Sequence, residues 1–307
     1  MTLQTFFKEN KPNLKQSSID LYKNRLNLLY KAVLNKKAEP RSVRFLYLNV
    51  NEIVDFIENS DKATTSKQSY FSICALSLDL LIKKTPLKKI KEAYDIYKTY
   101  ADKYKGEYEA KIKSGKPTDK QQKNYISLKE LLQYANNLDD VEYKAVALLS
   151  LNYTLRNDLR TLLIISNTEY DNLSKAEQDK NNYIVFSVKG KIYIVLNNYK
   201  TNKHYGQIKI NIEDATREAV FNYLQSLMFE GIHPFLTTKR GKPYTDKNFS
   251  EYIKRVFKGT GKNLTTTALR HIKISDTLGE QHKKNKALAK QMLHSVDTQK
   301  NYIINYE

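Results

Sequence analysis

Four short segments in the second half of the chain carry side chains that could act on a phosphodiester. They read YTLRND (153–158), NYKTNKHYG (198–206), TTTALRH (265–271) and MLHSVDTQKNY (292–302). Cleaving a phosphodiester without a metal requires a nucleophile, cations on the non-bridging oxygens and an acid for the departing 5′-oxygen. The segments supply such a set, namely Arg156, Lys200, Arg270, His294 and Tyr302. Because the segments are far apart in sequence, only folding could form one site from them.

The overall charge indicates a polyanionic partner. The 307 residues include 52 Lys and Arg against 33 Asp and Glu, which leaves a formal net charge of +19. Such a surface attracts nucleic acid, because each neutralised phosphate releases counterions, and an anionic membrane surface is the rival interpretation. No apolar run is long enough to span a bilayer, and the first residues lack the pattern of a secretory signal. We therefore expect an intracellular protein that does not enter a membrane.

The cysteine and histidine content argues against a metal or another cofactor. The only cysteine, Cys74, lies in the apolar stretch SICALSLDLL (72–81), which predicts a buried side chain and excludes an internal disulfide. The sequence contains no Cys/His cluster with the spacing of zinc ligands, no P-loop and no carboxylate cluster. We therefore expect chemistry that needs no cofactor.

The first hundred residues are predicted to be helical. Ser17 and Ser18 are candidate N-caps of an early helix. An apolar stripe at helical spacing follows them, made of Tyr22, Leu26, Leu29 and Val33. Further helices are predicted at 51–59, at 66–82 and from Leu87 onward. These segments together predict a compact helical domain over residues 1–100.

Residues 101–125 are predicted to be an exposed basic linker. The segment has few apolar residues, two glycines, one proline and an excess of lysine. Such a stretch could be a flexible tether or part of a clamp that closes around a duplex, and the sequence favours neither.

Residues 126–307 are predicted to form one mixed domain. Helices at 127–137 and 141–152 precede two β-rich runs around Lys189-Gly190, a pattern typical of a hairpin. The alternation of Ile208, Ile210 and Ile212 predicts a further half-buried strand. Helices follow to the end. The expected fold class is therefore mainly α with a small antiparallel β-sheet, in two domains.

The order of the four segments resembles that of the tyrosine recombinase, or phage integrase, family. The catalytic domain of that family carries Arg, a β-hairpin Lys, His-x-x-Arg, then His or Trp, and finally Tyr. The resemblance covers residues 126–307 and implies the catalytic residues Arg156, Lys200, Arg270, His294 and Tyr302. The alternatives for the first arginine, the lysine and the tyrosine are Arg160, Lys203 and Tyr306. Asp158 lies near the position of the family's acidic support, and in the family the first arginine lies at the start of a helix.

The sequence also departs from the family pattern. Thr267 stands where the family usually has a histidine, and it could donate a hydrogen bond to phosphate but cannot accept a proton near neutral pH. His271 is a reserve candidate for that role and is otherwise expected to be structural. Leu293 replaces the usual glycine, and the tyrosine stands eight residues beyond His294 instead of about nine. The base is therefore the least defined role.

The resemblance implies a site-specific recombinase or integrase that cleaves and rejoins double-stranded DNA through a 3′-phosphotyrosyl intermediate. It also implies a helical core-binding domain ahead of the catalytic domain and, when active, a tetramer on two duplexes. The sequence looks most like the divergent integrases of large DNA viruses and their satellite viruses. Two other functions remain open at this point: strand relaxation by a type IB topoisomerase, and sequence-specific DNA binding without catalysis.

Overall fold

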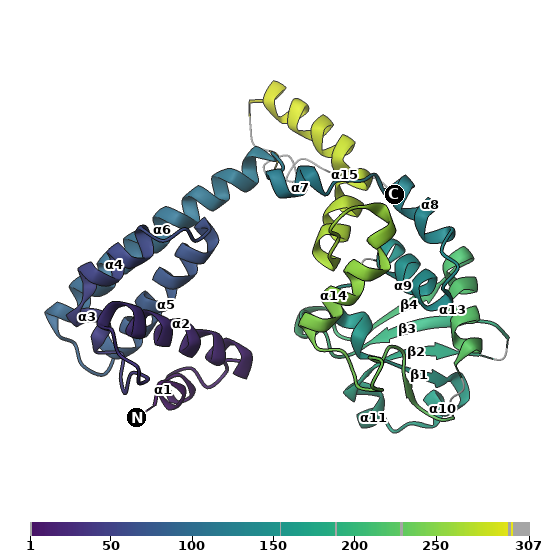
Figure 1. Ribbon diagram of the computed structural model, residues 1–307, viewed down its shortest axis with the longest axis horizontal. Helices are drawn as coiled ribbons and strands as arrows, with labels where there is room; N and C mark the ends of the chain where they lie inside the picture. Colours follow the sequence, from purple (N-terminus) through teal and green to yellow (C-terminus); the bar gives the residue numbers. More distant parts are fainter. Residues whose placement is uncertain (1, 154, 188, 228–229, 294–295, 297–307) are drawn as a thin grey trace. The chain divides into compact units, whose positions relative to one another are not determined.

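The computed structural model of the chain contains two compact units, Met1–Lys116 and Pro117–Glu307 (Figure 1). The structure describes residues 2–153, 155–187, 189–227, 230–293 and Val296. Most of these residues are helical, and a single small sheet lies in the second unit, which confirms the predicted fold class. Within them, no helix offers an apolar stretch of the length that a bilayer crossing requires.

The first unit consists of helices packed around one apolar core. They are α1 (Leu3–Asn10), α2 (Gln16–Leu34), α3 (Phe45–Leu48), α4 (Val50–Glu58), α5 (Thr64–Ile82) and α6 (Lys88–Ser114). The predicted stripe of α2 faces this core, where Leu26 and Leu29 are fully buried. Cys74 is also buried there, as predicted, and burial raises the pKa of its thiol.

The start of α2 differs from the prediction. The helix begins at Gln16, and Lys15 occupies the N-cap position without a side-chain hydrogen bond. The backbone N–H of Ser18 already donates to Lys15 O at 2.9 Å. Ser17 and Ser18 therefore lie inside the first turn, and their assignment as caps was wrong.

Much of the segment predicted as a linker is helical. Residues 101–114 continue α6, where Ala101 and Tyr104 are 5% and 7% exposed. The hydroxyl of Tyr104 donates to the carboxylate of Glu58, and Lys103 Nζ lies 3.1 Å from the same carboxylate. The apolar residues of α6 are sparse but lie on one helical face, so the low apolar content concealed a helix. The boundary between the units falls at Lys116.

The helices predicted at 127–137 and 141–152 are present in the second unit, after a short helix that lies in the segment predicted as a linker. The first elements of this unit are α7 (Asp119–Lys123), α8 (Leu128–Asn136), α9 (Val141–Asn152), the 3-10 helix η1 (Asn157–Thr161), β1 (Leu162–Ser166), α10 (Asn167–Asn172) and α11 (Lys175–Lys180). The later elements are β2 (Asn182–Phe186), β3 (Ile192–Leu196), α12 (Asn202–Tyr205), β4 (Ile208–Ile212), α13 (Asp214–Ser226), β5 (His233–Pro234), α14 (Asp246–Val256), η2 (Lys258–Thr260) and α15 (Thr266–Gln291). Ser127 caps α8 through a capping box with Glu130.

The sheet has the strand order β4-β3-β2-β1-β5. The predicted hairpin is present, because β2 and β3 pair antiparallel with Phe186 opposite Ile192. β4 pairs antiparallel with β3 and shows the predicted alternation, and β5 pairs antiparallel with β1. The pair β1–β2 is parallel, so the sheet is mixed rather than wholly antiparallel. The two helices α10 and α11 form the connection that a parallel pair requires.

Both faces of the central strands are buried. Ile164, Ile184 and Ile194 face the main core, which includes residues of α9 and α13. Val185 and Val195 face a smaller cluster together with Tyr170 of α10, Tyr183 and Tyr193. A sheet covered on both sides gives a rigid frame, and the segments that leave its ends are held where the strands place them.

Candidate active site

The turn that carries the first arginine lies between α9 and β1. Arg156 is half-buried and occupies the N-cap position of η1, whose Leu159 is fully buried. Thr161 Oγ1 donates to Asp158 O at 2.7 Å and closes the turn. After η1 the chain enters β1 instead of continuing as an α-helix, because the apolar run 162–166 pairs with strands on both sides. The family-like helix start predicted at this position is therefore a short 3-10 helix.

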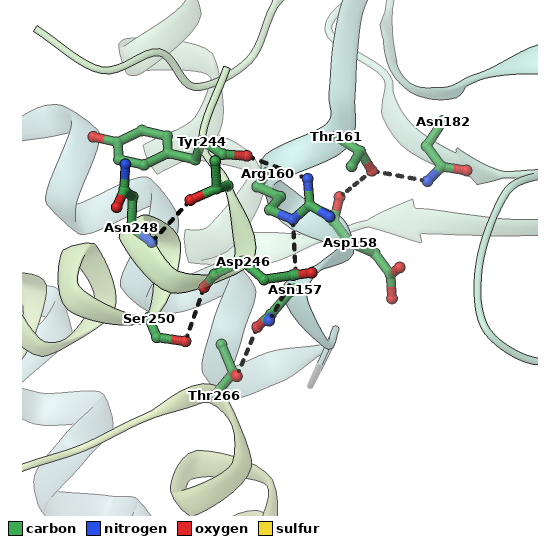
Figure 2. Close-up of polar contacts among 11 residues, drawn as sticks. Asn157, Asp158, Arg160, Thr161, Asn182, Tyr244, Asp246, Asn248, Ser250 and Thr266 are labelled. Atoms are coloured by element: carbon green, nitrogen blue, oxygen red, sulfur yellow. Dashed lines mark hydrogen bonds and ion pairs between the residues drawn. The ribbon is translucent and has the colours of Figure 1, made fainter. Parts of the chain in front are cut away.

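The side chain of Asn157 joins this turn to two later helices (Figure 2). Asn157 Nδ2 donates to Asp246 Oδ1 at 3.1 Å, at the start of α14. Thr266 Oγ1, at the start of α15, donates to Asn157 Oδ1 at 2.9 Å. Thr266 is 8% exposed, so the second contact is largely protected from water. The amide of Asn157 thereby fixes the turn of Arg156 relative to the helix of Arg270.

Arg160 is engaged in the same network. Its Nε lies 3.0 Å from Asp246 Oδ1, and one of its terminal nitrogens donates to Tyr244 O at 3.2 Å. The hydrogen bond from Asn157, and to a smaller extent the one from Arg160, holds the pKa of Asp246 below its usual range. The guanidinium of Arg160 is therefore engaged with α14 and with the residues just before it.

Asp158 is a half-buried carboxyl on the turn that carries Arg156. Burial raises the pKa of this carboxyl, while the charges of Arg156, Arg160 and Arg270 act in the opposite direction. The charge of Arg270, on α15, therefore acts on a carboxyl that lies on the turn of Arg156. In Figure 2 the carboxyl of Asp158 points away from the contact between Asn157 and Asp246.

The second arginine segment lies in the first turns of α15. Leu269 and Ile272 face the core, whereas Arg270 is half-buried and Thr267 is exposed. The spacing of three residues puts Thr267 and Arg270 on one side of the helix. His271 was expected to be structural if it is not the base. Its side chain is exposed, so the ring does not pack in the core.

The connection that carries Lys200 leaves the sheet at the end where η1 enters it. Asn182, the first residue of β2, donates through Nδ2 to Thr161 Oγ1 at 3.0 Å and to Asn198 O at 2.9 Å. Its Oδ1 accepts from the backbone N–H of Asn198 at 2.8 Å. We call this end, where β1 and β2 begin and β3 finishes, the site end of the sheet, and the opposite end the far end. The side chain of Lys200 itself is exposed.

His294, Tyr302 and the alternative Tyr306 lie outside the described residues. Just before them, Leu293 has a φ of 58° and is 94% exposed. That backbone conformation favours glycine, the residue usual at this place in the resembling family. Leu293, two residues beyond the end of α15, thus has a glycine-type backbone geometry.

Four polar residues that join the segments of the candidate site were not predicted from the sequence. Asn157, Asn182, Asp246 and Thr266 hold the segments together through contacts between distant parts of the chain. Such contacts leave no local periodicity, so no pattern in the sequence points to them. Among the described residues, no three His, Cys, Asp or Glu side chains gather in the way that a metal ion requires.

Comparisons with known proteins give a likeness of fold. No family model matches the sequence, and no curated protein matches it. Among solved structures, the chain is similar to the integrase of the Tn1549 transposon in complex with a circular intermediate DNA. The two chains are 12% identical, the TM-score is 0.52, and the alignment covers 100% of this chain and 96% of that chain. A XerA recombinase aligns with 14% identity over 99% of this chain and 94% of that chain, with a TM-score of 0.35. At this identity the integrase likeness shows a shared fold, and the XerA alignment is too weak to add to it.

Proposed function

We propose that this protein is a site-specific DNA recombinase or integrase that cuts and rejoins DNA through a tyrosine. The observation that carries the proposal is the hydrogen bond from Thr266 Oγ1 to Asn157 Oδ1, because it joins the turn of Arg156 to the first turn of the helix of Arg270. The two arginines come from segments far apart in sequence, and these segments are joined in a fold similar to that of an integrase solved on DNA. Two guanidinium groups around one point are suited to the non-bridging oxygens of a phosphate.

The proposed reaction conserves the energy of the phosphodiester. The phenol oxygen of Tyr302 attacks the scissile phosphorus, and the bond from phosphorus to the 5′-oxygen breaks. Lys200 gives a proton to the leaving 5′-oxygen, while Arg156, Arg270 and His294 stabilise the charge on the non-bridging oxygens. The product is a 3′-phosphotyrosyl link. A second 5′-hydroxyl then attacks this link and releases the tyrosine.

The proton of the attacking phenol needs an acceptor other than Thr267. A threonine hydroxyl can donate a hydrogen bond to the phosphate but cannot hold the proton. Asp158 and His271 are the titratable alternatives on the two arginine segments. Asp158 is half-buried among cations, whereas His271 is exposed. A comparison of the cleavage rates of Asp158→Asn and His271→Gln across pH would separate the two, because the loss of the base removes one limb of the profile.

The proposed substrate is double-stranded DNA, bound by the helical unit 1–116 together with the catalytic unit 117–307. The formal net charge of +19 favours binding through counterion release. Strand exchange joins two duplexes, so the active form is proposed to be a tetramer with one tyrosine for each strand.

The proposal is tested by trapping the covalent link. The protein is incubated with a pool of randomised duplexes that carry a nick, so that a short 5′-hydroxyl fragment diffuses away after cleavage. We expect a protein–DNA adduct that resists denaturing electrophoresis. Tyr302→Phe should abolish the adduct, and the matched variant Tyr306→Phe should retain it.

Three other outcomes would overturn part or all of the proposal. Persistence of the adduct in Tyr302→Phe removes the nucleophile assignment. DNA binding by the wild type without any adduct points to a binding protein without catalysis. Relaxation of supercoiled plasmid by the protein, without exchange between two copies of a recovered site, points to a topoisomerase.

A further inference from the structure

A basic hairpin between β5 and α14 has no part in the proposed chemistry. Residues 238–242 read TKRGK. Thr238 N donates to Lys242 O at 2.8 Å, and Gly241 N donates to Thr238 O at 2.8 Å. Lys242 N also donates to Thr238 Oγ1 at 3.2 Å. Gly241 has a φ of 69°, a conformation in which glycine carries no steric penalty. The closed turn fixes the points from which its three cationic side chains leave the chain.

Both limbs of the 238–242 hairpin are anchored at the site end of the sheet. On the incoming limb, Phe235 N donates to Leu162 O at 2.9 Å, at the start of β1. On the outgoing limb, Tyr244 O accepts a hydrogen bond from Arg160 at 3.2 Å. The hairpin therefore projects beside η1, the turn that carries the first arginine.

The cations of this hairpin are not neutralised by nearby acids. Lys239, Arg240 and Lys242 are all exposed. The segment 231–245 contains no Asp or Glu, and the first acid after it, Asp246, is bound to η1. Within the described residues, no ion pair joins any of the three side chains to a carboxylate. Three unscreened cations on a fixed turn form a site for a polyanion.

A second hairpin of the same construction lies at the far end of the sheet. Residues 187–191 read SVKGK. Ser187 N donates to Lys191 O at 2.9 Å, Gly190 N donates to Ser187 O at 3.0 Å, and Lys191 N donates to Ser187 Oγ at 3.1 Å. Lys189 and Lys191 occupy the positions that Arg240 and Lys242 occupy in the other turn. The two hairpins thus present cations on similar turns at opposite ends of one sheet.

We propose that the 238–242 hairpin binds backbone phosphates of the DNA that flank the scissile phosphate. The inference rests on the proposed function. A duplex held with one phosphate between Arg156 and Arg270 continues in both directions, and its neighbouring phosphates pass segments at the site end. The hairpin stands there with cations free to pair with them, whereas the 187–191 hairpin is separated from that position by the length of the sheet.

The matched hairpins supply the experiment. Arg240→Gln with Lys242→Gln is compared with Lys189→Gln with Lys191→Gln, so that both variants lose two positive charges from equivalent turn positions. Binding of a fluorescein-labelled duplex of arbitrary sequence is measured by anisotropy from about 50 to about 200 mM KCl. Thermal unfolding of both variants verifies that they are folded.

The expected results differ between the two variants. Each lost phosphate contact lowers the slope of log K against log salt by about 0.9, so the site-end variant should lose about 2 from its slope. The far-end variant should retain the wild-type slope. Restoring charge with Arg240→Lys and an intact Lys242 should recover the slope. Equal losses in both variants, or no loss in the site-end variant, would overturn the inference.

Failure of this inference is distinguishable from failure of the proposed function. If the wild type forms the covalent adduct but both hairpin variants bind alike, only the hairpin assignment is wrong. If the wild type forms no adduct and yet the site-end variant alone loses salt dependence, the hairpin binds DNA in a protein without the proposed catalysis.

Discussion

The two ends of the sheet differ in the hydrogen bonds that hold the chain there. At the far end, the 187–191 hairpin is closed by hydrogen bonds among residues within the same five positions. At the site end, Asn182 binds Thr161 and Asn198, and Asn157 binds Asp246 and Thr266. The far end is thus held by local contacts, and the site end by side chains that join five separate segments.

This difference explains why turns of one type can serve different purposes. The SVKGK and TKRGK turns have similar hydrogen bonds and similar charges. Only the second is anchored to η1 and to the start of β1, beside Arg156. Location relative to the arginines, rather than the chemistry of the turn, therefore separates a functional basic hairpin from an ordinary exposed one.

The largest effect is expected from removing either arginine at the site end. Arg156→Ala and Arg270→Ala should each lower the rate of adduct formation by about 10²–10³-fold, because each removes a donor to the developing charge. The rate is measured on a site recovered from the randomised duplexes. Lys189→Gln with Lys191→Gln, at the far end, should leave the rate unchanged. A loss of the same size in the far-end variant would remove the distinction between the two ends.

A large effect on folding is expected at Asn182. This side chain is 2% exposed and bonds to Thr161, Asn197 and Asn198. Asn182→Ala should reduce the free energy of unfolding by about 2–4 kcal/mol, because it leaves several buried groups without partners. At the far end, Ser187→Ala should cost less than about 0.5 kcal/mol, since the substitution removes one exposed local hydrogen bond of the side chain and leaves the backbone bonds of the turn intact. Urea denaturation of both variants measures the difference.

A smaller and more selective effect is expected at Asp246. Its carboxylate is 68% exposed, so Asp246→Ala should reduce stability by less than about 1 kcal/mol. The same change releases Asn157 and Arg160 and loosens the turn of Arg156, so the turnover of bound DNA should fall roughly 10-fold to 100-fold while affinity stays near that of the wild type.

The control for Asp246 lies on the same helix. Glu251→Ala removes an equal charge from α14, but within the part of the chain that the structure describes Glu251 pairs with Lys254 of the same helix and with no residue of η1. Its turnover should match the wild type. Equal losses in the two variants would mean that the charge of α14 matters and that its contact with η1 does not.

The smallest effect is a pH dependence at Asp158. Burial raises the pKa of Asp158, and the charge of Asp246 acts in the same direction. The charges of Arg156, Arg160 and Arg270 lower the pKa but do not outweigh burial. The ionised form is therefore less favoured in the folded chain than in the unfolded chain, so Asp158 reduces stability once the pH rises above its ordinary value of 3.8. The stability of Asp158→Asn relative to the wild type should increase as the pH rises above 3.8, and it should level off once Asp158 is ionised in the folded wild type. An increase as the pH falls would contradict the assigned direction.

The sequence predicted those parts of the fold that local patterns determine. The helix at 141–152 and the hairpin around Lys189-Gly190 follow from apolar spacing and turn residues, and both are present. The helical continuation of α6 through 101–114 was missed because a few buried aromatic and small residues suffice to hold it. β1 was also missed, since its short apolar run follows a segment interpreted as the start of a helix.

The candidate site was predicted only in its chemically distinctive residues. Arg156, Arg270 and Lys200 stand out because cations in a fixed chain order match a family pattern. Asn157 and Asp246 are ordinary residues by type, and their importance arises from contacts between segments that meet only after folding. No property of the sequence short of the three-dimensional fold distinguishes them from other polar surface residues.

The parallel pairing of β1 with β2 has a consequence for the order of folding. A hairpin such as β2–β3 closes a short loop and can form early, whereas the parallel pair must wait until the intervening residues 167–181 have traversed the sheet. The contacts of Asn157 with α14 and α15 span longer stretches still and carry a greater loop-closure entropy. Arg156 and Arg270 should therefore be among the last groups to acquire native surroundings during refolding, well after the β2–β3 ribbon is protected from amide exchange.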